Sequence, residues 1–327
     1  MGDPAGIGGE ITLKAWLQRK SDCIPAFCAV DNVERLRRLA ARLGWEVPVV
    51  AVDTVADAAS RFPQALPVFP VAAPVPDTLG APDSRSMAAI IESIETAARL
   101  AIEGEVVGMV TQPIHKSSLY GKGFAFPGHT EFLGHLTGTE AAPIMMLAGP
   151  DLRVVPVTIH IPIAEVPRQL TADLLEATVR VTHAALRADF GIEDPRIAIA
   201  GLNPHAGEQG AIGQEERTVI RPALDRLEAD GLNVTGPFAA DTMFHPVARR
   251  NYDVALCMYH DQALIPIKTL DFDGGVNVTL GLDFIRTSPD HGTAYDIAGT
   301  GTASPSSLIA ALRLAAELGA RRAARAT

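Results

Sequence analysis

The sequence has little that would mark a secreted, membrane-spanning or nucleic-acid-binding protein. Its three cysteines, Cys23, Cys28 and Cys257, are odd in number and form no CxxC pair, so we expect buried thiols in a reducing compartment rather than a disulfide framework. No segment approaches the roughly 18 consecutive apolar residues of a membrane span. Basic residues number 28 against 38 acidic ones, a net charge of −10, which argues against a nucleic-acid surface.

A secretory leader is also not expected, because the sequence opens directly on a Gly-rich loop, and this favours a cytoplasmic protein. What the sequence does contain is typical of a globular fold. It has 327 residues, of which 47% are hydrophobic and 20% charged, enough for one large core or two lobes. We find no internal repeat and no low-complexity segment.

Helical and strand patterns alternate along almost the whole chain, which is typical of βαβ units around a largely parallel sheet. Segment 63–76 carries five prolines and is expected to be extended or irregular. The Arg-rich end, 321–325, is expected to be a solvated helix end. The expected helices cover 10–19, 32–43, 83–103, 171–190, 215–229 and 306–318, and the expected strands cover 25–30, 47–52, 106–110, 152–157, 196–200 and 254–258.

Three histidines, His160, His205 and His260, each follow an apolar strand pattern at its junction with a loop. In parallel α/β folds, ligands bind beyond the carboxyl ends of the strands. Three imidazoles delivered there suit a divalent metal that keeps an open position for substrate. Any one of them alone could be a loop histidine with satisfied hydrogen bonds, but the repetition of the pattern favours a site.

Two glycine-rich segments predict ligand-binding loops. Segment 2–10 runs straight into a helix, where Gly6 and Gly8 would let the backbone approach a ligand and the helix N-terminus would attract anions. Such a loop can also be no more than a turn. Segment 286–301 is more specific, because a polar loop rich in Gly and Pro late in an α/β chain is typical of ligand binding.

These motifs resemble those of known enzymes. Segment 2–10 resembles the first βα loop of the isocitrate and isopropylmalate dehydrogenases, and segment 291–301 resembles their nicotinamide-cofactor loop. The other motifs narrow the resemblance, over essentially the whole chain, to the 4-hydroxythreonine-4-phosphate dehydrogenase family of pyridoxal phosphate synthesis. They are TQPIHK at 111–116, PGHTEFL at 127–133, GLNPHAGEQG at 201–210, MYHDQ at 258–262 and VNVTLGLDFIRTSPDHGTA at 276–294.

The resemblance implies an α/β, two-lobed, isocitrate dehydrogenase-like fold with mainly parallel sheets and an active-site cleft between the lobes. Residues 1–125 and 290–327 would form the cofactor-side lobe, and residues 126–289 the lobe that carries the metal, the substrate and the dimer contacts. In that family the active site is completed across a homodimer. The partners expected are therefore a phosphorylated amino-acid substrate and a second copy of the chain, with no nucleic acid and no membrane.

The resemblance also assigns residues. The three histidines would bind one divalent metal, Zn, Co or Mg, and an all-nitrogen ligand set favours Zn, Co or Ni over Mg. NAD is the expected cofactor. By resemblance, the substrate contacts are His129, Thr130, Lys268, Asn277 and Arg286, and the cofactor contacts are Gly6, Gly8, His291, Gly292, Asp296 and Ile297.

Several of these residues have a simpler interpretation. Lys268 could be an exposed surface lysine, and His129 could cap a helix. Asp241 could be the catalytic base, or a partner that orients a histidine, and equally could cap the next short helix. Asp296 could cap the turn before Ala298. Asp283 departs from the family pattern, which has Pro there, and its carboxylate could weaken phosphate binding if it points inward.

The activity implied is NAD-dependent oxidation of 4-phosphooxy-L-threonine at C3, followed by decarboxylation to 3-amino-2-oxopropyl phosphate. A sister enzyme that oxidises 4-phospho-threonate shares nearly every motif and stays an alternative. A phosphate acyltransferase of related fold is a remote one, since it needs no three-histidine site. The family also has a strand before the first loop, so we expect about 5–8 further residues upstream of Gly2.

Overall fold

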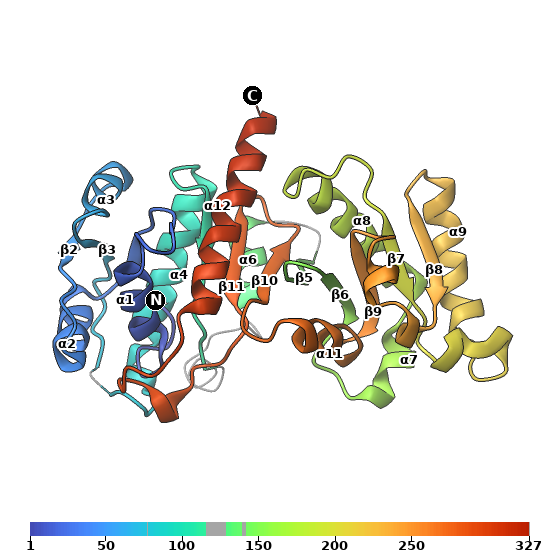
Figure 1. Cartoon of the computed structure of the whole chain (residues 1–327), viewed down its shortest axis with the longest axis horizontal. Coiled ribbons are helices and arrows are strands. Elements are labelled where there is room, and N and C mark those ends of the chain that lie inside the picture. The colour runs from blue at the N-terminus through green and yellow to red at the C-terminus, as the bar shows by residue number, and fades with distance from the viewer. Residues whose placement is uncertain (77, 116–128, 139–141, 327) are drawn as a thin grey trace. The chain divides into compact units, whose positions relative to one another are not determined.

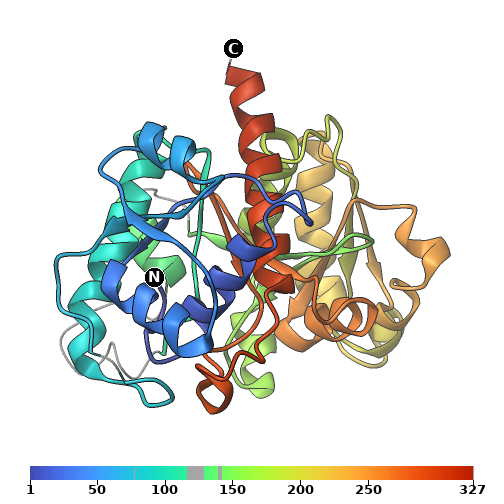
Figure 2. The ribbon, with the colours of Figure 1, turned by 60° about the vertical axis from the view of Figure 1, so that its left-hand side comes forward.

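The computed structural model describes residues 1–76, 78–115, 129–138 and 142–326, with the backbone alone for residues 129–131 and 326. The chain forms two compact units (Figures 1 and 2). Unit 1 comprises Met1–Glu140 and Leu282–Ala320, and unit 2 comprises Ala141–Gly281 and Arg321–Thr327. The assignment of cofactor and metal roles to two lobes stays a prediction.

Unit 1 contains a three-stranded parallel sheet and a separate parallel pair. The sheet has the order β1-β3-β2, from β1 (Ala29–Asp31), β2 (Val49–Ala51) and β3 (Leu66–Pro70), and the pair joins β4 (Gly108–Val110) to β11 (Ile285–Pro289). The proline-rich segment thus holds the central strand of the sheet, where Pro67 pairs with Val50. The prolines gave no indication of a strand in a sheet. The strand forms because Leu66, Val68 and Phe69 provide the apolar surface that keeps it in place.

The helices of unit 1 begin largely where the sequence predicts. The Asn32 side chain caps α2 by accepting from the Arg35 amide, and Asp83 accepts from the Arg85 amide at the turn that leads into α4. Both contacts satisfy amide groups that the first helical turn leaves without partners. The helices are α1 (Gly8–Leu17), α2 (Val33–Leu43), α3 (Val55–Arg61), α4 (Met87–Ile102), α6 (His129–Thr137) and α12 (Ser306–Ala326), whose residues up to Ala320 belong to unit 1.

Unit 2 contains six strands in the order β10-β5-β6-β9-β7-β8. The pairs β10·β5 and β5·β6 are antiparallel, and the pairs β6·β9, β9·β7 and β7·β8 are parallel. With the parallel sheets of unit 1, this confirms the expected α/β class with mainly parallel sheets. The strands are β5 (Ile144–Ala148), β6 (Arg153–Thr158), β7 (Ile197–Ala200), β8 (Val234–Phe238), β9 (Val254–Tyr259) and β10 (Val276–Leu280).

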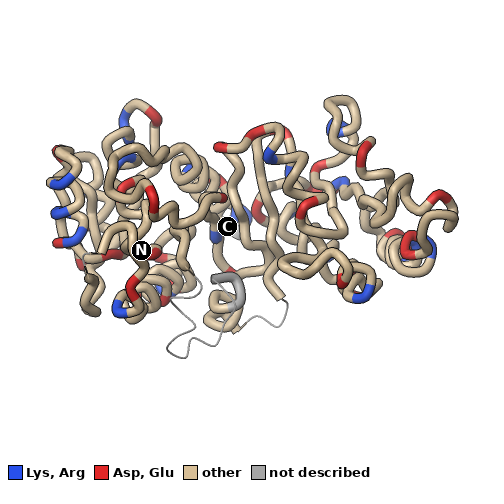
Figure 3. The backbone as a smooth tube through the Cα atoms, turned by 90° about the horizontal axis from the view of Figure 1, so that it is seen from below, with Lys and Arg blue, Asp and Glu red and all other residues tan. Residues whose placement is uncertain are grey.

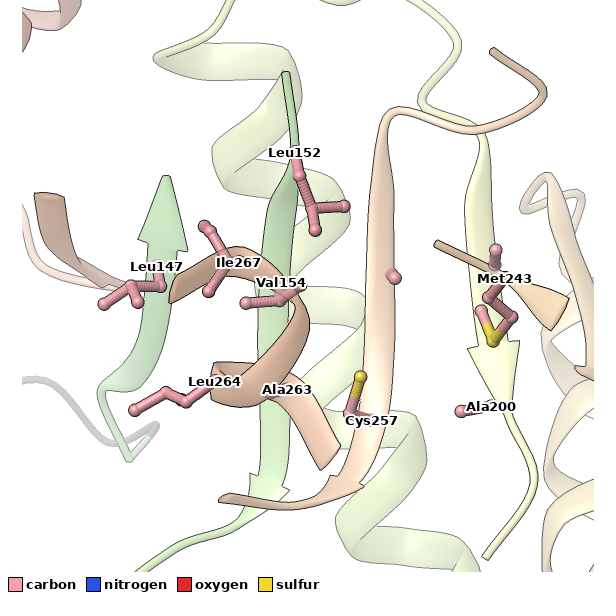
Figure 4. Close-up of a cluster of buried hydrophobic side chains, with 11 residues drawn as sticks. Leu147, Leu152, Val154, Ala200, Met243, Cys257, Ala263, Leu264 and Ile267 are labelled. Carbon is pink, nitrogen blue, oxygen red and sulfur yellow. The ribbon is translucent and has the colours of Figure 1, made fainter. Parts of the chain in front are cut away.

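The helices of unit 2 are α7 (Val166–Gln169), α8 (Ala172–Ala188), α9 (Arg221–Ala229), α10 (Pro246–Arg249) and α11 (His260–Leu270). A buried cluster fixes α11 against the sheet (Figure 4). Leu264 and Ile267, three residues apart on one helix face, pack with Leu147 and Val154 of the strands. Because truncating such a leucine typically costs about 2–5 kcal/mol, this cluster firmly positions the first residue of α11.

The Arg-rich end of α12 is largely exposed, as expected, but two of its arginines also make specific contacts. Arg322 donates to both oxygens of the buried Asp189 carboxylate, at 2.7 and 2.9 Å, and Arg321 donates to the Phe190 carbonyl oxygen at 2.7 Å. These contacts lie at the C-terminal end of α8, where a cation also meets the negative end of the helix dipole. These specific contacts could not be predicted because sequence pattern does not show which distant groups an arginine reaches.

Charged residues of both signs are interspersed along the backbone of each unit (Figure 3). Within the described part of the chain, no helix has the length and the apolar character needed to cross a lipid bilayer.

Candidate functional site

The three predicted histidines all lie beyond the carboxyl ends of neighbouring strands in unit 2. Strands β6, β9 and β7 are adjacent and parallel, so their carboxyl ends meet at one edge of the sheet. His160 lies two residues after β6, His260 is the first residue of α11 directly after β9, and His205 follows β7 in the turn Pro204–Gly210. The expected strands before these histidines are therefore confirmed.

Two of the imidazoles lie close together. The ring centroids of His160 and His260 are 5.7 Å apart with an angle of 40° between the ring planes. The Nδ1 atom of His260 lies 2.7 Å from Oδ1 of Asp261. A carboxylate only accepts hydrogen bonds, so Nδ1 carries the hydrogen and Nε2 keeps a lone pair for a ligand. A carboxylate on the far nitrogen is the arrangement that orients metal-binding histidines.

No three His, Cys, Asp or Glu side chains gather into a metal-binding group within the residues that the structure describes. The pair His160 and His260 can offer two nitrogen donors from one chain. Metal sites in proteins use three or four protein ligands. A three-histidine site therefore stays a prediction, and it would need a further ligand beyond this pair.

Gln262 ties the carboxyl ends of the strands together, a role that sequence reasoning missed. Its Nε2 donates to the Gly201 carbonyl oxygen at 2.8 Å, and its Oε1 accepts from the Met258 amide at 2.7 Å. The Thr158 hydroxyl adds a bond to the Met258 carbonyl oxygen at 2.7 Å. These bonds hold the ends of β6, β9 and β7 in register. The signal was available in the MYHDQ motif, where Gln262 lies two residues after His260.

His205 begins a left-handed turn that few sequences adopt. The φ angles of His205, Ala206, Glu208 and Gln209 are 53°, 50°, 43° and 55°. A left-handed conformation costs a residue with a side chain roughly 1–2 kcal/mol, so a run of them persists only where surrounding contacts impose it. Strain of this kind is commonly found at functional sites.

A buried carboxylate imposes this turn. Glu216 is 6% exposed; its Oε1 accepts from the Asn203 amide at 2.7 Å and its Oε2 from the Asn203 side chain at 3.0 Å. A Cβ atom at Gly207 would lie 2.5 Å from the same carboxylate, so only glycine fits there. Asn203 and Glu216 thus support the turn that carries His205, although sequence reasoning gave them no role.

The predicted substrate residues other than Arg286 differ in how far they are described: His129 and Thr130 belong to unit 1, and Lys268 and Asn277 to unit 2. His129 and Thr130 start α6, and their side chains lie outside the described residues. Lys268 lies on α11, is only partly exposed, and places its ammonium 5.5 Å from the ring centroid of Phe272. Asn277 lies on β10 and is also partly exposed. Lys268 is therefore not simply a solvated surface lysine.

Arg286, the predicted anion-binding arginine, is buried on β11 of unit 1. It is 5% exposed, and its Nε and Nη2 donate to the Thr111 hydroxyl at 3.0 and 2.6 Å. This bond fixes the plane of the guanidinium, which can otherwise bind an oxyanion through two parallel hydrogen bonds. Asp283, three residues earlier, is exposed.

The two glycine-rich loops of unit 1 meet each other. The Ile7 amide donates to the Thr293 carbonyl oxygen at 3.0 Å, just before α1 begins at Gly8. A Cβ atom at Gly6 would lie 2.6 Å from the same oxygen, so this close approach requires glycine. The predicted cofactor residues Gly6 and Gly8 therefore lie beside the loop that carries the other predicted cofactor residues.

Two charged residues of α1 hold the second glycine-rich loop, residues 286–301. The Glu10 carboxylate, 1% exposed, accepts from the amides of Gly299 and Ala303 at 2.9 and 3.0 Å. Lys14 donates from Nζ to the carbonyl oxygens of Gly301 and Ala303, at 2.6 Å each. Such charge-assisted bonds to opposite groups of one loop fix its backbone. Neither residue was singled out from the sequence, because each reads as an ordinary helix residue.

Tyr295 adds a further connection between the two loops. Its hydroxyl donates to Oδ2 of Asp3 at 2.7 Å. Burial, together with the neighbouring Asp3 carboxylate, raises the pKa of Tyr295 above its ordinary value, so the hydroxyl keeps its hydrogen at neutral pH. The start of the first loop and the middle of the second are thereby joined by a bond that physiological pH does not break.

His291 has an unsatisfied atom. Its Nδ1 lies 3.0 Å from the Gly292 carbonyl oxygen and must donate to it, which leaves Nε2 as an acceptor in the neutral ring. That Nε2 is buried and has no hydrogen-bond partner within the described residues. A buried polar atom without a partner is rare, and at a loop it is consistent with a ligand that donates a hydrogen bond.

Asp296 and Asp241 do not cap the turns proposed as their simpler roles. Asp296 is exposed and makes no side-chain hydrogen bond within the described residues, while Ile297 packs against a buried cluster. Asp241 is exposed in the short turn Ala240–Thr242. The next short helix, α10, is capped by His245, which accepts from the Ala248 amide. The carboxylates of Asp241 and Asp296 thus face solvent, and their proposed roles stay predictions.

Comparison with known proteins gives consistent matches over nearly the whole chain. The family described as "Pyridoxal phosphate biosynthetic protein PdxA" matches residues 22–315. A protein of Methylorubrum extorquens called 4-hydroxythreonine-4-phosphate dehydrogenase is 54% identical over 98% of this chain and 93% of its own length. One of the same name from Caulobacter vibrioides is 52% identical over 98% of this chain and 96% of its own length.

Solved structures agree with these matches. A crystal structure of a 4-hydroxythreonine-4-phosphate dehydrogenase from Burkholderia phymatum has a TM-score of 0.83 at 38% identity, covering 97% of this chain and 96% of that one. A terephthalate 1,2-cis-dihydrodiol dehydrogenase from Burkholderia xenovorans has a TM-score of 0.64 at 30% identity, covering 96% of this chain and 95% of that one. The fold is therefore shared with dehydrogenases that differ in their named substrates.

Proposed function

The chain belongs to the pyridoxal phosphate biosynthetic protein PdxA family, and from this premise we propose that it is an NAD-linked, metal-dependent 4-hydroxythreonine-4-phosphate dehydrogenase. The observation that carries the proposal is the 54% identity, over 98% of the chain, to a relative with that name. The histidine edge of unit 2 and the paired loops of unit 1 supply residues of the kinds that the reaction needs.

The proposed reaction oxidises the C3 hydroxyl of 4-phosphooxy-L-threonine. A hydride leaves C3 for NAD, and the hydroxyl proton passes to a base, for which we propose Asp241. The resulting β-keto acid then loses CO2; the electron pair of the broken C–C bond is finally protonated at carbon, which gives 3-amino-2-oxopropyl phosphate. A divalent metal, when bound, supplies Lewis acidity toward the substrate oxygen in both steps.

His160 and His260 fit a metal as two nitrogen donors, with Asp261 orienting the second ring. Because no third donor joins them within the described residues, we propose that a second copy of the chain completes the ligand set, with His205 as the remaining donor. Imidazole ligands favour Zn or Co over Mg. A homodimer with shared active sites follows from this proposal.

The substrate carries a phosphate, a carboxylate and an ammonium group, so it needs fixed cations and hydrogen-bonding groups. Arg286, which Thr111 holds in one plane, and Lys268 are the cations that we assign to its oxyanions. We assign Asn277, His129 and Thr130 to its remaining polar groups.

The cofactor assignment is supported by His291, whose buried Nε2 can accept a hydrogen bond from a ribose hydroxyl or an amide. Gly292, Ile297, Gly6 and Gly8 would contact the rest of NAD, and the exposed Asp296 carboxylate would accept from the adenosine ribose. NAD therefore carries the hydride while the two loops provide its orientation. A cytoplasmic location stays a prediction from cysteine usage.

One experiment tests the proposed function and its nearest rival. Metal-stripped protein is given Zn, Co or Mg, with NAD and one of three substrates: 4-phosphooxy-L-threonine, 4-phospho-threonate or an unphosphorylated cis-dihydrodiol. We expect NADH to form fastest from 4-phosphooxy-L-threonine, and only after metal is restored. Faster turnover of 4-phospho-threonate would assign the sister activity, and turnover of the dihydrodiol alone would reject both phosphorylated substrates.

A further inference from the structure

Ala294 has a strained backbone within the second glycine-rich loop. Its φ and ψ angles are 45° and 57°, which is the left-handed conformation. A residue with a Cβ atom adopts this conformation only at a cost in free energy, whereas glycine adopts it readily. The turn at Ala294 therefore depends on contacts made by its neighbours in the chain.

The first glycine-rich loop provides such contacts on both sides of Ala294. On one side, the Ile7 amide donates to the Thr293 carbonyl oxygen at 3.0 Å. On the other side, the Tyr295 hydroxyl donates to Oδ2 of Asp3 at 2.7 Å. The left-handed residue is thus held between two hydrogen bonds to one short segment, residues 3–7.

Asp3 is a firmly held acceptor for the Tyr295 hydroxyl. It is 3% exposed, and its second carboxylate oxygen, Oδ1, accepts from the Ala5 amide at 3.0 Å. Its backbone amide donates to the Pro113 carbonyl oxygen at 2.9 Å, which anchors it beside the segment that follows β4. Loss of the Tyr295 hydroxyl would leave Oδ2 without a donor among the described residues, so the bond is costly to break.

The ring and the backbone of Tyr295 are also enclosed. The ring lies against that of His115, with 5.7 Å between the centroids and 56° between the planes. A Cβ atom at Gly80 would lie 3.3 Å from the Tyr295 carbonyl oxygen, and the Gly80 amide donates to the Ala5 carbonyl oxygen at 2.8 Å. Burial, together with the Asp3 carboxylate, raises the pKa of Tyr295, so its hydroxyl donates throughout the neutral range.

The two residues after Tyr295 are among those that we assign to the cofactor. Asp296 and Ile297 complete the short turn Tyr295–Ile297, in which the Ala298 amide donates to the Tyr295 carbonyl oxygen at 3.3 Å. Ile297 packs against a buried cluster, while Asp296 is exposed. Because no side-chain hydrogen bond within the described residues directs the Asp296 carboxylate, the backbone angles of the turn that starts at Ala294 set its direction.

We propose that the hydrogen bond between Tyr295 and Asp3 is a positioning contact that sets the choice between NAD and NADP. It maintains the left-handed turn at Ala294 and thereby directs the Asp296 carboxylate toward the adenosine ribose. The inference rests on the proposed function, which assigns Asp296 to that ribose. Tyr295 acts through Asp296 and touches neither substrate nor cofactor, and the 2′-phosphate of NADP is the group that it helps to exclude.

The test removes the Tyr295 hydroxyl and keeps the ring, in Tyr295→Phe. Affinities for NAD and NADP are measured by titration calorimetry without substrate, so the result does not depend on the proposed reaction. We expect Kd for NAD to rise by about tenfold and Kd for NADP to change by less than about threefold, because the misdirected carboxylate neither binds the ribose nor repels the phosphate. In steady-state assays, KM for NAD should rise with kcat nearly constant.

Tyr252→Phe is the matched control. It removes a tyrosine hydroxyl that donates to the Met243 carbonyl oxygen at 2.9 Å, in unit 2. This control should leave the affinities for both nucleotides unchanged. Loss of NAD affinity in Tyr252→Phe equal to that in Tyr295→Phe would overturn the proposal, since the effect would then come from general destabilisation.

Ala294→Gly separates positioning from direct contact. Glycine adopts the left-handed turn without strain, so the turn should persist without the Tyr295 hydroxyl. We expect the double variant Ala294→Gly/Tyr295→Phe to regain most of the preference for NAD, and Ala294→Gly alone to differ little from the unsubstituted protein. A hydroxyl that contacts the cofactor directly would not be replaced in this way, so a double variant as weak as Tyr295→Phe would overturn the positioning role.

Amide hydrogen exchange in the cofactor-free proteins follows the turn itself. Exchange in residues 295–298 should be about tenfold faster in Tyr295→Phe than in the unsubstituted protein. Faster exchange with unchanged nucleotide affinities would reduce the bond to a structural one, and unchanged exchange would show that it does not hold the turn; either result overturns the proposal. Binding of neither nucleotide by the unsubstituted protein would reject the proposed cofactor itself, and the positioning role with it.

Discussion

The second glycine-rich loop of unit 1 (residues 286–301) and the edge of unit 2 that carries His160, His205 and His260 (the histidine edge) both lie beyond the carboxyl ends of strands. Hydrogen bonds from neighbouring side chains hold these two regions to different degrees. In unit 1, the buried Glu10 carboxylate and the Lys14 ammonium each bond twice to residues 299–303. In unit 2, His160 and His205 are exposed, and both have positive φ angles. One loop is fixed by charged side chains of its own unit, while the other region presents exposed imidazoles on left-handed backbone.

This difference indicates how each region would bind. A loop that its own helix already holds loses little conformational entropy when a ligand arrives, so its contacts contribute directly to affinity. If the proposed function holds, the exposed imidazoles gain further contacts when a metal or a second copy of the chain binds. Substitutions should therefore affect metal binding most at the histidine edge and cofactor affinity most at the loop.

The largest effect is expected for His260→Ala. The variant loses the imidazole whose Nε2 is left open by the Asp261 contact, so bound metal should largely disappear and kcat/KM should fall by about a thousandfold or more. Metal content is measured by elemental analysis after dialysis, and activity with 4-phosphooxy-L-threonine and NAD.

The matched control is His245→Ala, which removes an exposed histidine that caps the short helix α10. It should keep both metal and activity, with a stability loss of about 1 kcal/mol. Wild-type metal content in His260→Ala would contradict the assignment of the histidine edge to metal binding.

A smaller effect is expected for Glu216→Gln. The carboxylate now accepts one hydrogen bond from the Asn203 backbone amide and one from its side chain. The NH2 group of the introduced glutamine would face one of these two donors and lose that bond, so the left-handed turn that carries His205 should loosen. Metal affinity should fall by about 10- to 100-fold with little change in KM for NAD. Titration calorimetry measures the affinity, and the exposed Glu193→Gln is the control. A lower Tm with unchanged metal affinity would show that Glu216 supports only the fold.

A region can be predicted from the sequence when the contacts that determine its structure join residues close together in the chain. The strands before His160, His205 and His260 are predictable because a short apolar run followed by a polar loop is a local pattern. The turn at 205–209 is not, because it depends on Glu216, which lies beyond it and reads as an ordinary helix residue. Likewise, no local pattern connects Glu10 with Gly299, since their contact depends on the folded unit.

In strand β3, by contrast, a local signal in the sequence pointed away from the observed structure. Its prolines favoured an extended or irregular segment rather than a sheet strand, yet Leu66, Val68 and Phe69 are buried in a strand between two neighbours. Burial of each such side chain contributes roughly 1.5–3 kcal/mol, which outweighs the hydrogen bond that Pro67 cannot donate, worth about 1 kcal/mol. Proline is a reliable breaker only where packing does not compensate for it.

Asp296→Lys tests the cofactor side of the comparison. The resemblance of residues 291–301 to the nicotinamide-cofactor loop of the isocitrate dehydrogenases places Asp296 among the expected cofactor contacts. If the carboxylate repels a 2′-phosphate by ~1.4–3 kcal/mol, NAD should be preferred by roughly ten- to a hundredfold in kcat/KM. The lysine should erode or reverse that preference while metal content stays unchanged. Equal efficiency with NAD and NADP in the unsubstituted protein would contradict this role for Asp296.

The smallest effect, and the one that separates the two regions most directly, is expected for Glu10→Gln. The carboxylate now accepts from two amides, whereas a glutamine has one carbonyl oxygen and would turn its NH2 group toward the second amide. Residues 299–303 should then keep the two bonds from Lys14 but only one of the two bonds to residue 10. Because the loop contributes to binding rather than to the chemical step, KM for NAD should rise by about five- to tenfold with kcat nearly constant. Metal affinity, which depends on unit 2, should not change.

The exposed Glu95→Gln on α4 is the matched control and should leave both constants unaltered. A fall in Tm without a change in KM would assign Glu10 to stability alone, whereas a fall in metal affinity would show that the two regions are not independent.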